Sequence, residues 1–147
     1  MTIAGGCRCG RVRYELVSDE LPLSYACHCL DCQTWSGSAF MLHAMVPEDA
    51  LKIRGEAVRL RLPGGTEVMP SEHVGCASCL TRIANTNSAI PGVAVLKMGT
   101  LDRSKEVVPA AHIWVSRAQP WIMFDEDAPC FDETPSPQAF ANAIAGR

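Results

Sequence analysis

The spacing of its cysteines constrains this chain more than any other feature. Seven of the eight cysteines fall in three short clusters. Two cysteines separated by one or two residues at a bend can direct both sulfurs onto one metal ion, while nearby backbone N–H groups donate hydrogen bonds to the thiolates. The clusters are Cys7 with Cys9, then Cys27, Cys29 and Cys32, then Cys76 with Cys79.

The first and last clusters together supply one complete metal site. Cys7 and Cys9 with Cys76 and Cys79 give four thiolates, which is the tetrahedral ligand set of a closed structural zinc. Such a site would pin an N-terminal hairpin to a second hairpin far along the chain. We therefore expect a structural Zn²⁺ here.

The middle cluster differs because Cys27, Cys29 and Cys32 supply three thiolates with no obvious fourth ligand beside them. Three protein ligands and one exchangeable position are typical of a catalytic zinc. With three thiolates the site would carry a charge of about −1, so water, hydroxide or a substrate thiol would complete it. We expect His28, between two ligands, to point away from the ion.

Other interpretations of the cysteines stay open. A CxC or CxxC pair can form a disulfide, although a reducing compartment disfavours it. Iron-sulfur clusters usually need four protein ligands in other spacings. Cys130 or a histidine could close the second site and make it structural too, in which case both metals would only hold the fold of a binding module.

Composition indicates one soluble cytoplasmic domain over residues 1–147, with a core at about 3–131. Of the 147 residues 48% are hydrophobic and 20% charged, as in ordinary folded domains. The net charge of −3 argues against nucleic-acid binding, which needs a concentrated basic surface. No basic and then apolar leader opens the chain, and no apolar run approaches the roughly 20 residues that cross a bilayer. The oligomeric state is not predicted.

Residue patterns favour a mainly β fold of short antiparallel strands, with the spacing of a β-sandwich or barrel-like sheet pair. A short helix is expected at 30–36, ending at Gly37. A second is expected at 136–145, with Ser136 as N-cap, Pro137 at its first position and Gly146 as its stop. The expected strands span 11–17, 21–26, 39–46, 51–53, 57–62, 72–75, 82–86, 93–98 and 111–115.

Several of these segments resemble one known family, the glutathione-dependent formaldehyde-activating enzymes, which also includes centromere protein V. The resemblance covers most of the chain up to about Phe131. It rests on the segments GGCRCGRVRY (5–14), CHCLDC (27–32), GSAF (37–40), CASC (76–79), AHIWV (111–115) and PW (120–121).

The resemblance implies a β-tent fold with two zinc ions per chain. It also implies a carbon-sulfur lyase activity that joins glutathione and formaldehyde as S-hydroxymethylglutathione. By position, the four-cysteine set matches the family's structural site, and Cys27, Cys29 and Cys32 match its catalytic site.

One position departs from the family, because Leu80 stands where its members usually have Gly. Leucine disfavours a positive φ, so a reshaped turn is expected there. Other polar residues carry weaker expectations. Arg8, Arg11 and Arg82 could cluster near the metals to meet glutathione carboxylates, whereas His43 and His112 fit hydrogen-bonded sheet residues better than acid-base groups.

Overall fold

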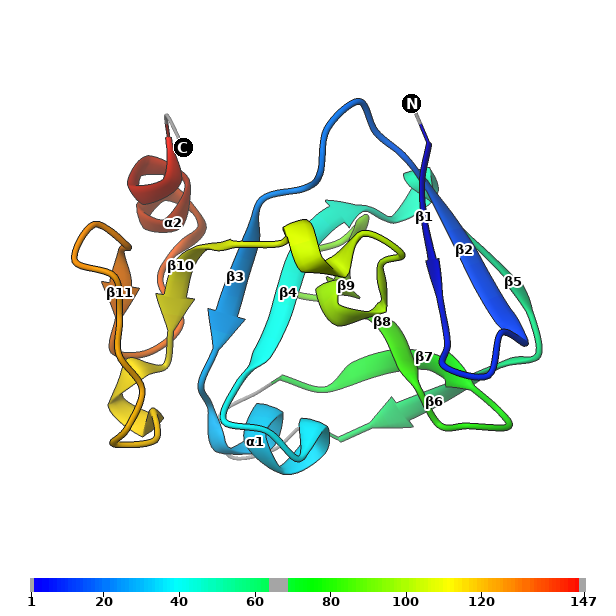
Figure 1. The fold of residues 1–147 in the computed structure, drawn as a ribbon, viewed down its shortest axis with the longest axis horizontal. Coiled ribbons are helices and arrows are strands. Elements are labelled where there is room, and N and C mark those ends of the chain that lie inside the picture. The colour runs from blue at the N-terminus through cyan, green and yellow to red at the C-terminus, as the bar shows by residue number, and fades with distance from the viewer. Residues whose placement is uncertain (1, 64–68, 146–147) are drawn as a thin grey trace. The chain divides into compact units, whose positions relative to one another are not determined.

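The computed structural model describes residues 2–63 and 69–145 (Figure 1). The chain divides into two compact units, each built from two segments. The first unit comprises Met1–Pro22 and Ala44–Val107, and the second comprises Leu23–His43 and Val108–Arg147. No helix among the described residues has the length and apolar character needed to cross a membrane.

A three-stranded antiparallel sheet opens the first unit. Its strands are β1 (Thr2–Gly6), β2 (Val12–Val17) and β5 (Leu51–Gly55), in the order β1-β2-β5. Alternate residues of β2 are buried, which follows from the period of two along a strand. Gly5 lies opposite Tyr14, where a Cβ atom would collide with the tyrosine ring. Cys7 therefore follows a strand whose position is fixed by its neighbours.

Four further strands of the first unit lie in the order β9-β8-β7-β6, and each described pairing among them is antiparallel. Ile83 and Leu96 are fully buried on these strands. The described part of this unit also contains three short 3-10 helices, η1 (Glu48–Ala50), η2 (Met98–Thr100) and η3 (Ser104–Glu106). The strands are β6 (Ala57–Leu62), β7 (Ser71–Cys76), β8 (Arg82–Thr86) and β9 (Val93–Lys97).

The second unit is built on parallel pairs. β10 (Pro109–Ile113) pairs with both β3 (Ser24–Cys27) and β11 (Cys130–Phe131). The expectation of antiparallel strands throughout is therefore wrong for these three. Parallel neighbours need a long crossover, and the many residues between β3 and β10 supply one. β4 (Met41–Pro47) begins in this unit and ends in the first.

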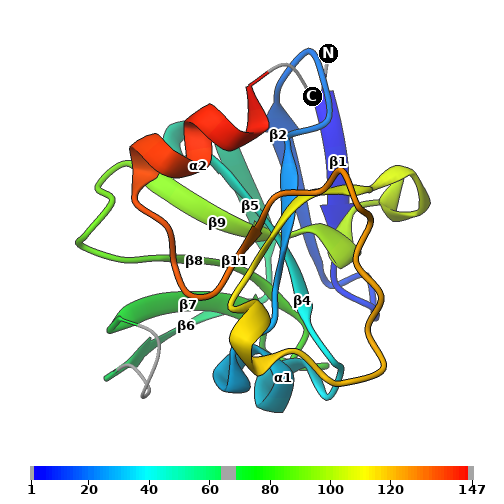
Figure 2. The same cartoon turned by 90° about the vertical axis from the view of Figure 1, so that its left-hand side faces the viewer.

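Both predicted helices are present in the second unit. α1 (Leu30–Ser36) ends at Gly37, which has φ 64° and donates its N–H to Gln33 O. α2 (Pro137–Ile144) begins after Ser136, whose hydroxyl accepts the Ala139 N–H. The predicted stop at Gly146 lies outside the described residues. Figure 2 shows α2 and β11 facing the viewer.

The mainly β prediction with two helices is confirmed, and the strand ends differ only locally. The strand expected at 111–115 stops at Ile113, because Trp114 adopts φ 59° and a 3-10 turn, η4 (Val115–Arg117), follows. β11 was not predicted. Two residues are too few to show an alternating pattern.

Candidate metal centres

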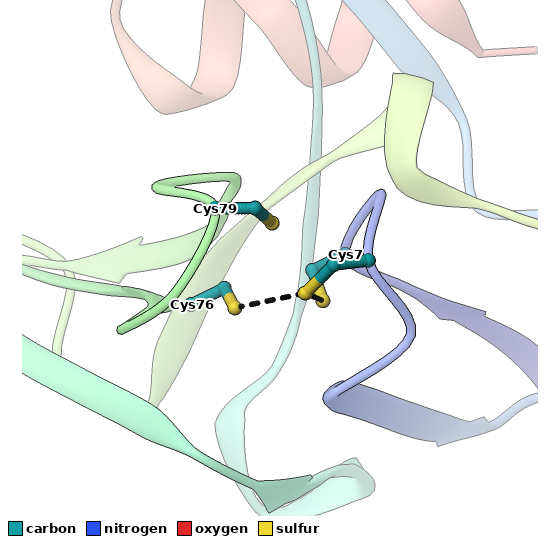
Figure 3. Close-up of side chains that lie close together, drawn as sticks. Cys7, Cys76 and Cys79 are labelled. Atoms are coloured by element: carbon teal, nitrogen blue, oxygen red, sulfur yellow. Dashed lines mark hydrogen bonds between the residues drawn. The ribbon is translucent and has the colours of Figure 1, made fainter.

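The four-cysteine centre forms where two turns of the first unit meet. Cys7 and Cys9 lie in the turn after β1, while Cys76 ends β7 and Cys79 lies in the turn before β8. Figure 3 shows Cys76 and Cys79 on one turn, pointing toward the turn that carries Cys7.

The sulfur positions fit one tetrahedral ion. All four Sγ atoms lie within 4.8 Å of one another. Cys7 Sγ is 3.5 Å from Cys9 Sγ, which is 3.6 Å from Cys76 Sγ. Four sulfurs placed about 2.3 Å from a zinc ion are roughly 3.8 Å apart. The donor set and its spacing are therefore compatible with zinc.

Backbone hydrogen bonds hold both cysteine turns. Gly10 N–H donates to Cys7 O at 3.1 Å, and Val12 N–H donates to Cys7 Sγ at 3.2 Å. In the other turn Leu80 N–H donates to Cys76 O at 3.1 Å. Donation to sulfur favours the thiolate, which is the form that binds metal.

Thr81 supports this centre, although the sequence alone gave it no such role. Its hydroxyl lies 3.1 Å from Cys79 Sγ, and the same oxygen accepts Arg8 N–H at 3.3 Å. Hydrogen bonds from the Thr81 hydroxyl and backbone, followed by the backbone of Cys9, lower the pKa of Cys79 to about 5. Thr81 thus joins the two turns as well as stabilising a thiolate.

Leu80 corrects one expectation. The turn keeps a left-handed residue at this position, with φ 60°, and the predicted reshaping is wrong. The Leu80 side chain is 79% exposed, so little apolar burial offsets the strain. The hydrogen bonds of the cysteine turn hold the backbone in place despite the leucine.

Replacing Leu80 by glycine is expected to stabilise the zinc-loaded protein by about 0.5–1 kcal/mol. The gain is the left-handed strain of roughly 1–2 kcal/mol, less the extra entropy of glycine in the unfolded chain. Urea unfolding of the loaded protein measures it. Leu80→Ala is the control, since alanine keeps the Cβ atom and should give no such gain. Equal stability of the two variants would contradict strain at this position.

The three-cysteine centre lies where β3 meets α1. Cys27 is the last residue of β3, Cys29 is the N-cap of α1, and Cys32 lies in its first turn. All three are buried, and their Sγ atoms lie within 4.8 Å of one another. Across residues 2–63 and 69–145, no histidine, aspartate or glutamate joins this mutual grouping.

Cys29 carries the negative charge of this cluster most readily. Hydrogen bonds from the Cys27 and Cys32 side chains, then from the backbone of Cys32 and Asp31, lower its pKa to about 3 even though burial opposes ionisation. The Cys32 N–H lies 3.3 Å from Cys29 Sγ. Hydrogen bonds to Cys29 and Cys32, together with burial, raise the pKa of Cys27 instead, so Cys29 is the first of the two to ionise.

Tyr25 and His43 stand beside the second cluster. His43 Nε2 lies 3.5 Å from Cys32 Sγ, and the His43 ring stacks on Tyr25 with centroids 5.4 Å apart. Burial raises the pKa of Tyr25, and negative charge on Cys27, Cys32 and Cys29 raises it further. Tyr25 could not be singled out from the sequence, because its contacts depend on the neighbouring strand and helix.

The structure leaves Cys130 outside both cysteine groups. Cys130 is exposed in β11, and its thiol donates to Ala128 O at 3.4 Å. It joins neither metal-compatible group of the described residues. The structure thus offers no support for closure of the second centre by Cys130.

His28 is engaged away from the cluster. Its Nε2 lies 3.0 Å from His112 Nδ1, and its ring packs against Phe40 and Phe124. Burial, with a smaller contribution from His112, lowers the pKa of His28 to about 4. The imidazole is therefore neutral at pH 7.

Arg11 and Arg82 have separate partners. Arg11 pairs with Glu56 at 3.2 Å, while Arg82 Nη2 donates to His73 Nδ1 at 2.8 Å. His73 in turn bonds to Ser71 Oγ at 2.5 Å. These contacts engage Arg11 and Arg82 with different partners, and their grouping with Arg8 around glutathione carboxylates stays a prediction.

The fold and the two cysteine groups together define a mainly β protein with one four-cysteine and one three-cysteine cluster, each of which could hold a metal ion. The family model of the glutathione-dependent formaldehyde-activating enzyme matches residues 2–117, so the chain belongs to that family. A search of curated proteins gives no significant match.

A solved structure supports the fold alone. The chain is similar to a Rhodobacter sphaeroides protein of known crystal structure, with a TM-score of 0.52 and 19% sequence identity. The alignment covers 72% of this chain and 97% of that one.

Proposed function

We propose that the chain is a cytoplasmic, zinc-dependent carbon-sulfur lyase that interconverts a small thiol plus an aldehyde with their adduct. Family membership suggests glutathione and formaldehyde as the pair and S-hydroxymethylglutathione as the product. In this proposal residues 1–147 form a single zinc-binding domain. Cys7, Cys9, Cys76 and Cys79 hold a structural zinc.

The observation that carries the proposal is the incomplete ligand set of the second centre. Cys27, Cys29 and Cys32 come within 4.8 Å of one another as a group of three. A tetrahedral ion held by three protein ligands keeps one position for substrate. A zinc ion bound there would favour the thiolate form of an incoming thiol and polarise a carbonyl oxygen.

The chain's own residues prepare the site for this chemistry. Burial of the three cysteines excludes bulk water, and the backbone N–H of Cys32 donates to Cys29 Sγ at 3.3 Å, which favours the thiolate that binds metal. In the overall reaction the thiol loses its proton, a carbon-sulfur bond forms, and the carbonyl π electrons move to oxygen, which takes up a proton. The reverse reaction breaks the carbon-sulfur bond and restores thiol and aldehyde.

Exchange spectroscopy tests the proposal, because thiol and formaldehyde also combine without a catalyst. We expect the zinc-loaded chain to increase the NMR exchange rate between glutathione and S-hydroxymethylglutathione at equilibrium. The metal-free chain should fall back to the uncatalysed rate. A loaded chain with two zinc ions that leaves the rate unchanged would contradict the enzyme and favour a binding module whose metals are structural.

A further inference from the structure

A histidine that is not among the three cysteine ligands contacts one of them in the second centre. His43 lies in β4 with 6% of its surface exposed. Its Nε2 atom is 3.5 Å from Cys32 Sγ. We propose that His43 is a positioning residue that donates Nε2–H to the Cys32 thiolate without binding the metal, an inference that rests on the proposed function of this centre.

The direction of the hydrogen bond follows from the chemistry of its two atoms. A thiolate has lone pairs and no proton, so it can only accept. The imidazole must therefore carry its proton on Nε2. A separation of 3.5 Å suits sulfur, whose radius is larger than that of oxygen.

The same geometry argues against His43 as a fourth ligand. In a tetrahedral site with bonds of about 2.0–2.3 Å, every pair of ligand atoms lies roughly 3.5–3.8 Å apart. His43 meets that spacing toward Cys32, yet it does not belong to the group whose ligand atoms all lie within 4.8 Å. His43 therefore contacts the sulfur of Cys32 from outside the group of three cysteines.

Aromatic packing fixes the ring in the orientation that the hydrogen bond needs. The His43 and Tyr25 rings are stacked, with 24° between their planes. Tyr25 meets Phe140 of α2 edge-on, with centroids 5.4 Å apart and planes at 76°. A ring held on one side by this stack cannot turn freely, so Nε2 stays directed at Cys32.

A hydrogen-bond donor beside one thiolate reduces the electron density that this sulfur donates to the metal. Hydrogen bonding withdraws electron density from Cys32 and orients its lone pairs. Partners of this kind typically alter metal affinity 10- to 100-fold when they are removed. Because the second centre would carry three thiolates, such a donor also offsets part of their negative charge.

The test uses the full chain loaded with Co²⁺ and compares His43→Phe, which removes the donor, with His43→Gln, which keeps an N–H group. We expect His43→Phe to weaken Co²⁺ affinity at the second centre about 10- to 100-fold in chelator competition. Its sulfur-to-cobalt absorption should move to lower energy, while the d–d bands keep their four-coordinate form. His43→Gln should recover part of both effects.

His73→Gln is the matched control, since His73 is equally buried but bonds to Ser71 and Arg82. It should leave the second-centre bands unchanged. In the zinc-loaded wild type, ¹⁵N-histidine NMR should show a proton on His43 Nε2. An unprotonated, metal-bound Nε2 would overturn the proposal, as would His43→Phe bands and affinity equal to those of wild type.

These outcomes separate the role of His43 from the activity. If the zinc-loaded wild type shows no catalysis but His43→Phe shifts the cobalt bands, the proposed activity is wrong and the positioning role of His43 stands. If catalysis is present but His43→Phe leaves the cobalt bands unchanged, the activity stands and the positioning role is wrong. A wild-type chain that binds only one Co²⁺ would overturn both.

Discussion

Cys76→Ser is expected to lower the melting temperature by more than about 10 °C and to abolish the first metal centre. Cys76 is fully buried at the end of β7, and its sulfur lies 3.6 Å from that of Cys9 in the other turn. Structural zinc contributes roughly 10–16 kcal/mol to small zinc domains, whereas a whole domain is usually stable by about 5–15 kcal/mol. Calorimetry of the zinc-loaded variant, with metal analysis, measures the loss.

Cys130→Ser is the matched control for that experiment. Cys130 is exposed and belongs to neither sulfur group, so its replacement should shift the melting temperature by no more than about 1 °C. Two zinc ions per chain in Cys76→Ser, with a melting temperature like that of the control, would contradict a structural role for the first centre.

The sequence predicted the cysteine groupings well, because the relevant information is local. A CxC or CxxC pair brings two sulfurs together through a single turn, whatever the rest of the chain does. Only the pairing of Cys7 and Cys9 with Cys76 and Cys79 is long-range. It was predictable because a closed tetrahedral site needs four ligands, which two cysteine pairs supply. The structure brings together the same four and the same three sulfurs.

The contacts around the ligands could not be predicted, because they depend on tertiary neighbours. Thr81 reaches Cys79 from within its own turn but also meets Arg8 of a distant turn. His43 occupies a sheet position, as its apolar surroundings indicated, and only the place of α1 reveals its contact with Cys32. The residue pattern predicts the strand that carries His43 but not the helix that packs beside it.

The predicted antiparallel pairing was wrong for β3, β10 and β11 for a related reason. Period-two patterning identifies a strand and the face it buries, but the pattern is the same for parallel and antiparallel partners. β3 and β10 are separated by most of the chain, so no turn signal sets their direction. At Leu80 the prediction failed although the signal was local, because turn hydrogen bonds impose a backbone conformation that leucine disfavours.

Cys29→Ser is expected to remove catalysis while leaving the first centre intact. Serine is itself a good N-cap, so its oxygen can still accept Cys32 N–H and α1 should begin at the same place. The exchange therefore removes one thiolate from the second centre without removing the cap of its helix. The protein should bind one zinc per chain instead of two.

The activity should fall sharply because two protein ligands hold zinc poorly in a site built for three. Metal-assisted stabilisation is worth several kcal/mol, and each 1.36 kcal/mol is tenfold in rate, so the protein-dependent exchange between glutathione and its formaldehyde adduct should fall by about 10³-fold or more. Exchange NMR at matched protein concentration measures this, with Cys130→Ser keeping the wild-type rate. Catalysis that survives in Cys29→Ser would mean that the acceleration arises elsewhere in the chain, since this cluster could no longer hold its ion with three thiolates.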